Sequence, residues 1–452
     1  LSCDDYKLGG SSFAQILGEI GKKTPTVKDS AFVVNVFNTI QELIRKDLIF
    51  AGHDVGSGGL ITTIMEMCFA DNNIAANIDL TAIGEKNSIK LLFSENPGIV
   101  IQSKDESIEK ILDDKGIDYY KIGSVTTEQK LLLKNHSDSY EINIEEYRDY
   151  WFKTSMLLDK KQTANNLSEI RYINYKKQSL NFKFPIGFSG IKPITLEMKN
   201  RPKAAVIREK GSNSERELAN ALFLAGFQVK DIHMTDLISG RENLEDVQFI
   251  GVVGGFSNSD VLGSAKGWAG AFLYNEKAKE SINNFISRED TLSIGLCNGC
   301  QLFMELEVVN PDHEIHGKMT FNDSNKHESG FTSVDIQKNN SVMMSSLENC
   351  NLGVWISHGE GKFNLPYSED KYNIIAKYSY EGYPSNPNGS DFNIAMMSSS
   401  DGRHLVTMPH IERSIFQWNW AYYIRGRNDE VSPWIQAFIN ARDWIISYNP
   451  KK

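Results

Sequence analysis

The segment 292–304 constrains the fold of this chain more than any other stretch of its sequence. It reads as an apolar strand, Leu292-Ser293-Ile294, then Gly295-Leu296-Cys297-Asn298-Gly299, then an apolar helix that contains Leu302-Phe303-Met304. This order matches the nucleophile elbow, in which a catalytic side chain lies on a tight turn between a strand and a helix. The turn can close only where the neighbouring residues are glycines. The pattern therefore predicts an α/β domain with Cys297 as its nucleophile.

At the start of a helix, Cys297 would lie near the positive end of the helix dipole, which stabilises a thiolate. The N–H of Asn298 would then point toward an oxyanion formed at the sulfur. Other interpretations of this cysteine stay open from the residues alone. Cys297 and Cys300 form C-x-x-C, which occurs in redox pairs and in halves of zinc sites, and a buried structural cysteine also fits the turn. The flanking Gly295 and Gly299 favour the nucleophile, because neither alternative needs them.

A thiol nucleophile needs a base, and the base needs a group that orients it. Downstream, an apolar strand leads into Pro409-His410-Ile411-Glu412. In extended backbone, residues two apart project on one face, so the carboxylate of Glu412 can hold the imidazole of His410 in one tautomer. We therefore expect His410 to be the base. A second histidine, His358, lies in the glycine-bracketed Ser357-His358-Gly359-Glu360-Gly361 and could also line the pocket.

From Lys203 onward, strands and helices alternate along the sequence. An apolar strand at Ala204-Ala205-Val206-Ile207 is followed by a helical pattern from Ser214 to Phe227 and by a strand from Val247 to Val253. This rhythm predicts a parallel sheet with helices on both faces, and such folds bind ligands at the carboxyl ends of their strands. Just there, the N–H of Gly255 is a candidate second donor to the oxyanion.

The sequence divides into three parts. Residues 1–170 read as an α+β unit, 171–200 as a basic linker, and 201–452 as the domain that carries the elbow. Residues 171–203 hold eight basic residues against one acidic residue, together with three prolines. Such a segment is either a connector that contacts an anion or a solvated linker between two acidic domains.

Composition excludes several classes of protein. The formal net charge is −10, which argues against a nucleic-acid partner, since binding to nucleic acid needs clustered positive charge. We expect no membrane partner and a cytoplasmic location, because the sequence shows neither a long apolar run nor the layout of a signal peptide. Five scattered cysteines are typical of a protein with a reactive thiol rather than a disulfide framework.

With a cysteine in the elbow and a distant His-x-Glu, the chain resembles the class I (triad) glutamine amidotransferases. More closely, residues 201–452 resemble the glutaminase domain of the phosphoribosylformylglycinamidine synthases, in their large single-chain form. The resemblance implies a flavodoxin-like parallel sheet for this domain. It is carried by motifs in the same order, which are Gly254-Gly255-Phe256-Ser257, Asp260-Val261-Leu262-Gly263, Lys266-Gly267-Trp268-Ala269, Ser357-His358-Gly359-Glu360-Gly361, Tyr383-Pro384-Ser385-Asn386-Pro387-Asn388-Gly389-Ser390 and Ser432-Pro433-Trp434.

The first unit extends the resemblance. Leu8-Gly9-Gly10-Ser11 and, later, His53-Asp54-Val55-Gly56-Ser57-Gly58-Gly59-Leu60 are similar to the C-terminal subdomain of the ATP-binding superfamily that includes aminoimidazole ribonucleotide synthetase. This implies ATP and Mg²⁺ as cofactors, with Asp54 as a magnesium ligand and Gly56 at a nucleotide-contacting position. That position is often a serine in the family and is glycine here. Since only the large form fuses the two units, we expect Leu1 to be an interior residue of a longer protein.

The resemblance implies an ATP-dependent carbon–nitrogen ligase with glutamine as amido donor. ATP, formylglycinamide ribonucleotide, glutamine and water would give formylglycinamidine ribonucleotide, ADP, phosphate and glutamate, in purine biosynthesis. Ammonia would pass internally to the synthetase, most of which would lie in a missing portion on the N-terminal side. The alternative is a thiol peptidase or chaperone-like hydrolase on the same elbow. The site residues implied by the resemblance are Cys297, His410 and Glu412 for catalysis, Gly255 and Asn298 for the oxyanion, and Gln301 for glutamine.

Overall fold

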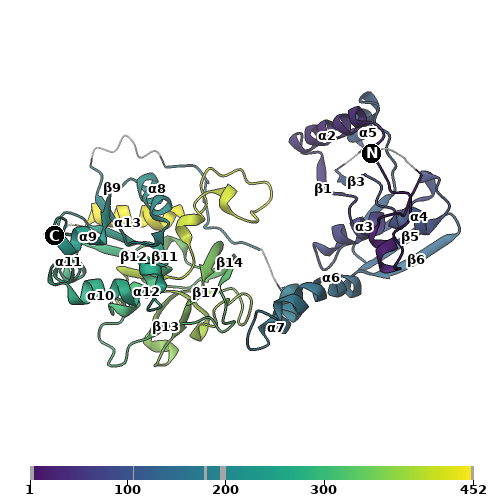
Figure 1. Ribbon diagram of the computed structural model, residues 1–452. Helices are drawn as coiled ribbons and strands as arrows, with labels where there is room; N and C mark the ends of the chain where they lie inside the picture. The colour runs from purple at the N-terminus through teal and green to yellow at the C-terminus, as the bar shows by residue number, and fades with distance from the viewer. Residues whose placement is uncertain (1–4, 105, 178–180, 194–199, 449–452) are drawn as a thin grey trace. The chain divides into compact units, whose positions relative to one another are not determined.

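The computed structural model describes residues 5–104, 106–177, 181–193 and 200–448. The chain forms two compact units, Leu1–Leu157 and Leu158–Lys452. Figure 1 follows the chain by colour from the first unit, in purple and blue, into the second, in teal to yellow.

The first unit is an α+β arrangement built on two sheets. One is a four-stranded sheet in the order β4-β2-β5-β6, in which only the β2–β5 pair is parallel, and the other is the antiparallel pair β1-β3. Two separate apolar clusters, one around Leu131 and Leu133 and one around Leu43, form its core. The strands are β1 Ile49–Asp54, β2 Ala75–Asp79, β3 Ile99–Ser103, β4 Gly123–Thr126, β5 Lys130–Asn135 and β6 Asp138–Asn143. The helices are α1 Ser12–Ile16, α2 Ser30–Arg45, α3 Gly59–Phe69, α4 Ser88–Phe93, α5 Ser107–Asp114 and α6 Ile144–Asp159, the last of which crosses the boundary between the units.

A carboxylate joins two helix starts in this unit. Oε1 of Glu95 accepts hydrogen bonds from the backbone N–H of Ser12 at 2.8 Å and from that of Gly58 at 2.9 Å. These N–H groups lie at the starts of α1 and α3, where backbone donors have no partner within the helix. Burial alone would raise the pKa of the Glu95 carboxyl, but the two N–H donors outweigh it and lower that pKa. Glu95 therefore acts as a shared cap in its ionised form.

Replacing Glu95 with alanine is expected to lower the free energy of unfolding of the first unit by about 1–3 kcal/mol, because two backbone donors lose their acceptor. Glu95→Gln keeps a carbonyl acceptor and should cost less. Since the folded pKa is depressed, the contribution of Glu95 is complete above the unfolded value of 4.5 and is lost as the pH falls below it. Urea unfolding at neutral pH and at pH 3 measures both effects, and equal stability of the three proteins at neutral pH would contradict the capping role.

The second unit is organised by one nine-stranded sheet in the order β15-β14-β17-β18-β19-β12-β10-β7-β9. The neighbours from β19 through β12, β10 and β7 to β9 pair in parallel, whereas those from β15 to β19 pair antiparallel. The α/β fold is thus confirmed, and an antiparallel half extends the predicted parallel sheet. The strands are β7 Lys203–Arg208, β8 Ser212–Asn213, β9 Gln228–His233, β10 Phe249–Val252, β11 Gly254–Gly255, β12 Leu292–Leu296, β13 Lys318–Thr320, β14 Glu328–Ile336, β15 Asn351–His358, β16 Lys362–Asn364, β17 Asn373–Tyr378, β18 Ile394–Ser398 and β19 His404–Thr407.

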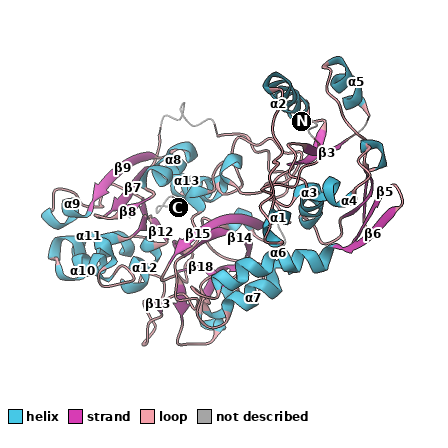
Figure 2. Ribbon diagram, turned by 45° about the vertical axis from the view of Figure 1, so that its right-hand side comes forward, coloured by secondary structure: helices cyan, strands magenta, loops and turns pink. Residues whose placement is uncertain are grey.

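Helices cover both faces of the parallel strands, as the alternating pattern predicts. Figures 1 and 2 show α8 and α13 on one side of these strands and α10, α11 and α12 on the other. The helices are α7 Leu167–Asn174, α8 Glu215–Ala225, α9 Met234–Ser239, α10 Lys266–Tyr274, α11 Glu276–Ser287, α12 Asn298–Glu305 and α13 Ile435–Ser447.

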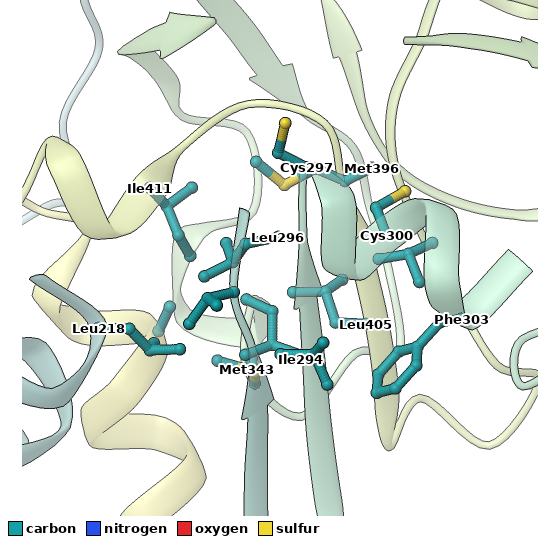
Figure 3. Packing of buried hydrophobic residues seen from close by; sticks show 14 of the residues in the cluster. Leu218, Ile294, Leu296, Cys297, Cys300, Phe303, Met343, Met396, Leu405 and Ile411 are labelled. Carbon is teal, nitrogen blue, oxygen red and sulfur yellow. The ribbon is translucent and has the colours of Figure 1, made fainter. Parts of the chain in front are cut away.

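The central strands are buried along their whole length. Every residue of β10 and β12 is buried, which is the expected composition of parallel strands with helices on both faces. Side chains such as Ile294, Leu405 and Met396 belong to the large apolar cluster of this unit (Figure 3). The sulfur of Cys297 lies at one end of this cluster and points away from Ile294 and Leu296. The carboxyl end of β12 is therefore the place where a reactive side chain leaves the apolar core.

The basic segment between the predicted domains packs on the second unit. The ring of Phe182 lies 5.0 Å from that of Trp420, centroid to centroid, and Lys183 forms a β-bridge with Asn351. Arg171 pairs with Asp159 and with Glu328 of β14. The described part of the segment is thus anchored to the second unit through Arg171, Phe182 and Lys183. Residues 178–180 and 194–199 of this prediction lie outside the described residues.

Candidate active site

Cys297 lies on the turn between β12 and α12, as the sequence pattern predicts. Its backbone has φ 51° and ψ −102°, a strained conformation for a residue with a side chain. The flanking glycines are required by contact, because a Cβ at Gly295 would lie 2.5 Å from the carbonyl oxygen of Gly299. A Cβ at Gly299 would lie 2.2 Å from the carbonyl oxygen of Val252 in β10. The turn therefore closes only with glycine on both sides of the cysteine.

His410 and Glu412 form a buried pair just after β19. Nδ1 of His410 lies 2.6 Å from Oε1 of Glu412, and the two side chains are only 2% and 0% exposed. The backbone N–H of His410 donates to the carbonyl oxygen of Trp355 at 2.8 Å, which fixes the residue against β15. The carboxylate therefore holds the proton on Nδ1 of the neutral ring and leaves Nε2 for proton transfer.

Cys297 and His410 meet at the same place. A Cβ at Gly254 would lie 2.8 Å from Cε1 of His410 and 3.4 Å from Cβ of Cys297, so the two side chains share a neighbour. Both also line one cavity, which we call the Cys297 cavity. Burial alone would lower the pKa of the His410 imidazole, but the charges of Glu412 and then of Cys297, with hydrogen bonds to both, raise it. The geometry thus favours an imidazolium beside the sulfur.

The two cysteines of the C-x-x-C sequence do not share an environment. Cys297 lines the Cys297 cavity, whereas Cys300 is fully buried in the apolar core of the unit. Burial and, next, the neighbouring Cys297 raise the pKa of the Cys300 thiol well above its usual value. Only the first of the pair is thus placed to react with a molecule in the cavity.

The predicted oxyanion donors lie at the same site. Gly255 lines the Cys297 cavity and has φ 106°, and a Cβ there would lie 2.6 Å from the backbone nitrogen of Asn213. Asn298 is the first residue of α12, where backbone N–H groups have no acceptor within the helix. Its side chain accepts from the N–H of Ser257 at 3.2 Å, which ties the start of α12 to the loop after β11.

Gln301 lines the Cys297 cavity, but both ends of its amide are engaged by the protein. Its Oε1 accepts from Nδ2 of Asn298 at 2.7 Å, and its Nε2 donates to the carbonyl oxygen of Glu360 at 2.7 Å. Gln301 thus joins the first turn of α12 to the glycine-bracketed loop after β15. This loop brings His358 into the cavity as well, as its sequence indicated.

Three charged side chains at the Cys297 cavity have no role in the sequence analysis. They are Asp260 after β11, Glu360 after β15 and Arg413 directly after Glu412. Asp260 and Glu360 both lie inside motifs that carry the resemblance, and this position was the one sequence signal that could have marked them as site residues. Their convergence depends on three loops that are far apart in sequence.

The predicted magnesium and nucleotide residues lie in the loop between β1 and α3. The side chain of Asp54 is 85% exposed, and Nδ1 of His53 lies 3.6 Å from its Oδ1. A Cβ at Gly56 would have no atom within 4 Å, so the space beside this residue is open. The N–H of Gly58, two residues later, already donates to Glu95. Across the described part of the chain, no three His, Cys, Asp or Glu side chains converge as metal ligands. Asp54 could supply one carboxylate ligand, and a magnesium ion bound by it would take its other ligands from water and from phosphate oxygens of a substrate.

Among the described residues, none of the helices is both long enough and apolar enough to cross a membrane.

Comparison with known proteins assigns both units. Residues 201–445 match the family model of the CobB/CobQ-like glutamine amidotransferase domain, and residues 5–134 match that of the C-terminal domain of AIR synthase related proteins. Both match the units expected from sequence.

Among curated relatives, the chain is 36% identical to a probable phosphoribosylformylglycinamidine synthase, chloroplastic/mitochondrial, of Arabidopsis thaliana, over 98% of this chain and 33% of the relative. It is 33% identical to the human phosphoribosylformylglycinamidine synthase, over 99% of this chain and 36% of the relative. The chain therefore spans about a third of the length of these relatives. Among solved structures, PurLQS from Thermotoga maritima is 24% identical, with a TM-score of 0.42, over 53% of this chain and 98% of that one.

Proposed function

Because the chain belongs to the family of CobB/CobQ-like glutamine amidotransferase domains, we propose that its second unit hydrolyses glutamine to glutamate and ammonia. The observation that carries this proposal is the placement of Cys297, on a strained turn at a helix start, beside the buried pair of His410 and Glu412. This arrangement supplies a nucleophile, a proton carrier and a group that orients the carrier.

In the proposed reaction, the sulfur of Cys297 attacks the carbonyl carbon of the glutamine side chain, and the oxygen takes up the negative charge. The N–H groups of Asn298 and Gly255 stabilise this oxyanion. As the oxyanion collapses, the carbon–nitrogen bond breaks and the imidazolium of His410 protonates the leaving nitrogen, which yields ammonia and a γ-glutamyl thioester. Neutral His410 then takes a proton from water, which hydrolyses the thioester to glutamate, while Glu412 holds the ring. Gln301 would line the glutamine pocket and hold the start of α12 against the loop after β15.

We extend this proposal to the whole reaction named by the relatives. The ammonia would serve the ATP-dependent conversion of formylglycinamide ribonucleotide to the amidine, as in a phosphoribosylformylglycinamidine synthase. The rest of the synthetase would come from sequence that corresponds to the other two thirds of the relatives. The boundaries at 170 and 200, the cytoplasmic location and roles for Mg²⁺, Asp54 and Gly56 also remain proposals. The comparisons give no support to a thiol peptidase or chaperone-like hydrolase.

Covalent labelling tests the proposed site directly. A diazo-ketone analogue of glutamine should alkylate Cys297, and free glutamine should protect it, because both molecules compete for one cavity. Peptide mass spectrometry after one equivalent of reagent gives the modified residue. The described cysteines Cys68, Cys300 and Cys350 should stay unmodified because none of them lines the Cys297 cavity, and burial raises the pKa of Cys68 to about 11.

The control is the same labelling after Cys297→Ala, which should leave the protein unmodified. Modification of another cysteine while Cys297 stays free would contradict the proposed site.

A further inference from the structure

A second cavity lies on the antiparallel half of the large sheet. β14 pairs with β15 from Glu328 to Asp335, but it pairs with β17 only from Val334 onward. After Ser379 the chain that follows β17 leaves β14, and a cavity of about 360 Å³ opens between them, which we call the β14 cavity. Since ligand pockets measure about 300–1,000 Å³, this volume suits one small molecule.

Two buried polar atoms of residues that line the β14 cavity have no hydrogen-bond partner within the described chain. One is Oδ1 of Asn351, although Nδ2 of the same side chain donates to Oδ1 of Asp335 and to Oγ of Ser379, each at 2.8 Å. The other is the hydroxyl oxygen of Tyr380. Because buried polar groups are normally hydrogen-bonded, these two atoms indicate a polar ligand that offers both a donor and an acceptor.

Four charged side chains line the β14 cavity, and two of them are already paired. Arg171 forms an ion pair with Glu328, to which the hydroxyl of Tyr383 also donates at 2.9 Å. The half-buried Asp335 and the exposed Lys177 differ from these, because neither forms an ion pair in the part of the chain that the structure describes. One negative and one positive charge therefore line the same cavity without neutralising each other.

A ligand for this cavity should satisfy these groups together. Carboxylates accept hydrogen bonds from ribose hydroxyls, and lysine binds phosphate as a point charge. A ribose phosphate therefore offers hydroxyls to Asp335 and Asn351 and an anion to Lys177. An amino acid also carries both charges, but it is smaller and lacks the row of hydroxyls that would match the lining. Among the described lining residues, the hydroxyl side chains are Ser329, Thr332, Ser333, Ser379, Tyr380 and Ser385.

We propose that the β14 cavity binds a phosphorylated ribose, with the sugar hydroxyls on Asp335 and Asn351 and the phosphate at Lys177. The hydroxyl of Tyr380 completes the contacts to the sugar. Free pentose phosphates and nucleoside monophosphates share this chemistry. The site is separate from the proposed glutaminase, because the β14 cavity and the Cys297 cavity have no lining residue in common among the described residues.

Isothermal titration calorimetry on the whole chain tests the proposal with ribose 5-phosphate. This compound should bind about 10-fold or more tightly than 2-deoxyribose 5-phosphate and than ribose, because each of these lacks one charge-assisted contact. Asp335→Asn should abolish the preference over 2-deoxyribose 5-phosphate only, and Lys177→Met should abolish the preference over ribose only. Adenosine 5′-monophosphate separates the two sources. Tighter binding that depends on Asp335 assigns the site to nucleotides, and weaker binding assigns it to free sugar phosphates.

Tyr380→Phe is a second variant that does not endanger the fold. It removes a hydroxyl without a partner in the described chain, so it should weaken binding of ribose 5-phosphate several-fold and leave thermal unfolding unchanged. The matched controls Asp370→Asn and Lys371→Gln change exposed charges outside the cavity and should keep both preferences. The proposal is overturned by equal affinities for the three compounds, by absence of saturable binding, by tighter binding of glutamate, or by preferences that persist in Asp335→Asn and Lys177→Met.

Discussion

Replacing Cys297 with alanine is expected to lower the rate of glutamine hydrolysis by about 10⁴-fold or more, because the thioester can no longer form. The fold should persist, since the elbow depends on Gly295 and Gly299 and alanine keeps the Cβ. Release of glutamate, followed with a coupled dehydrogenase, measures the loss.

The same variant separates the two halves of the proposed enzyme. In a preparation that contains the complete synthetase, Cys297→Ala should abolish amidation supported by glutamine and leave amidation supported by added ammonia unchanged. Cys350→Ala removes a buried thiol outside the Cys297 cavity and should keep both activities. Loss of both activities in Cys297→Ala would contradict a scheme with separate glutaminase and synthetase sites.

Glu412→Gln should produce the second large effect, a loss of about 10³-fold in kcat, because an amide at this position no longer fixes the tautomer of His410 or stabilises its charged form. The substitution should also shift the pH dependence of kcat/KM in a defined direction. The negative charge of Glu412 helps to raise the pKa of His410, so its removal lowers that pKa. The imidazolium that protonates the leaving nitrogen is then lost at lower pH. The alkaline limb of the kcat/KM profile should therefore move to lower pH in the variant.

Glu314→Gln, which changes an exposed carboxylate of the same unit, serves as the control and should keep the wild-type profile. An alkaline limb that stays in place in Glu412→Gln, or moves to higher pH, would show that His410 does not carry the titration. A complete rescue of kcat at any pH would show that Glu412 does not orient the ring.

The parts of the candidate site that were predictable from sequence are those encoded within a few residues. Cys297 stands out because a Cβ at Gly295 would lie 2.5 Å from the carbonyl oxygen of Gly299, so the turn itself requires glycine. His410 and Glu412 stand out because a spacing of two places both side chains on one face of extended backbone, and the structure joins them at 2.6 Å. Local sequence carries such signals because local geometry imposes them.

Other features arise from contacts between distant segments and left no local signal. The antiparallel half of the large sheet pairs β14 with β15 and β17 with β18, and its strands pair by long-range register rather than by a local pattern. The basic composition of 171–203 indicated a linker or an anion site, yet Phe182 and Arg171 dock it on the second unit. Composition records charge, whereas docking depends on which surface the segment meets.

The sequence by itself placed Cys297 on an elbow, paired His410 with Glu412 and predicted the α/β unit that holds them, because an elbow and a His-x-Glu pair are short-range constraints on backbone and charge. Only the tertiary structure decided what surrounds them. Asp260, Glu360 and Arg413 reach one cavity from three separate loops, and Glu95 occupies backbone donors in a loop that reads as a nucleotide contact. The physical reason is that ligand recognition depends on charges converging in space, and convergence is set by the packing of the sheet and its loops.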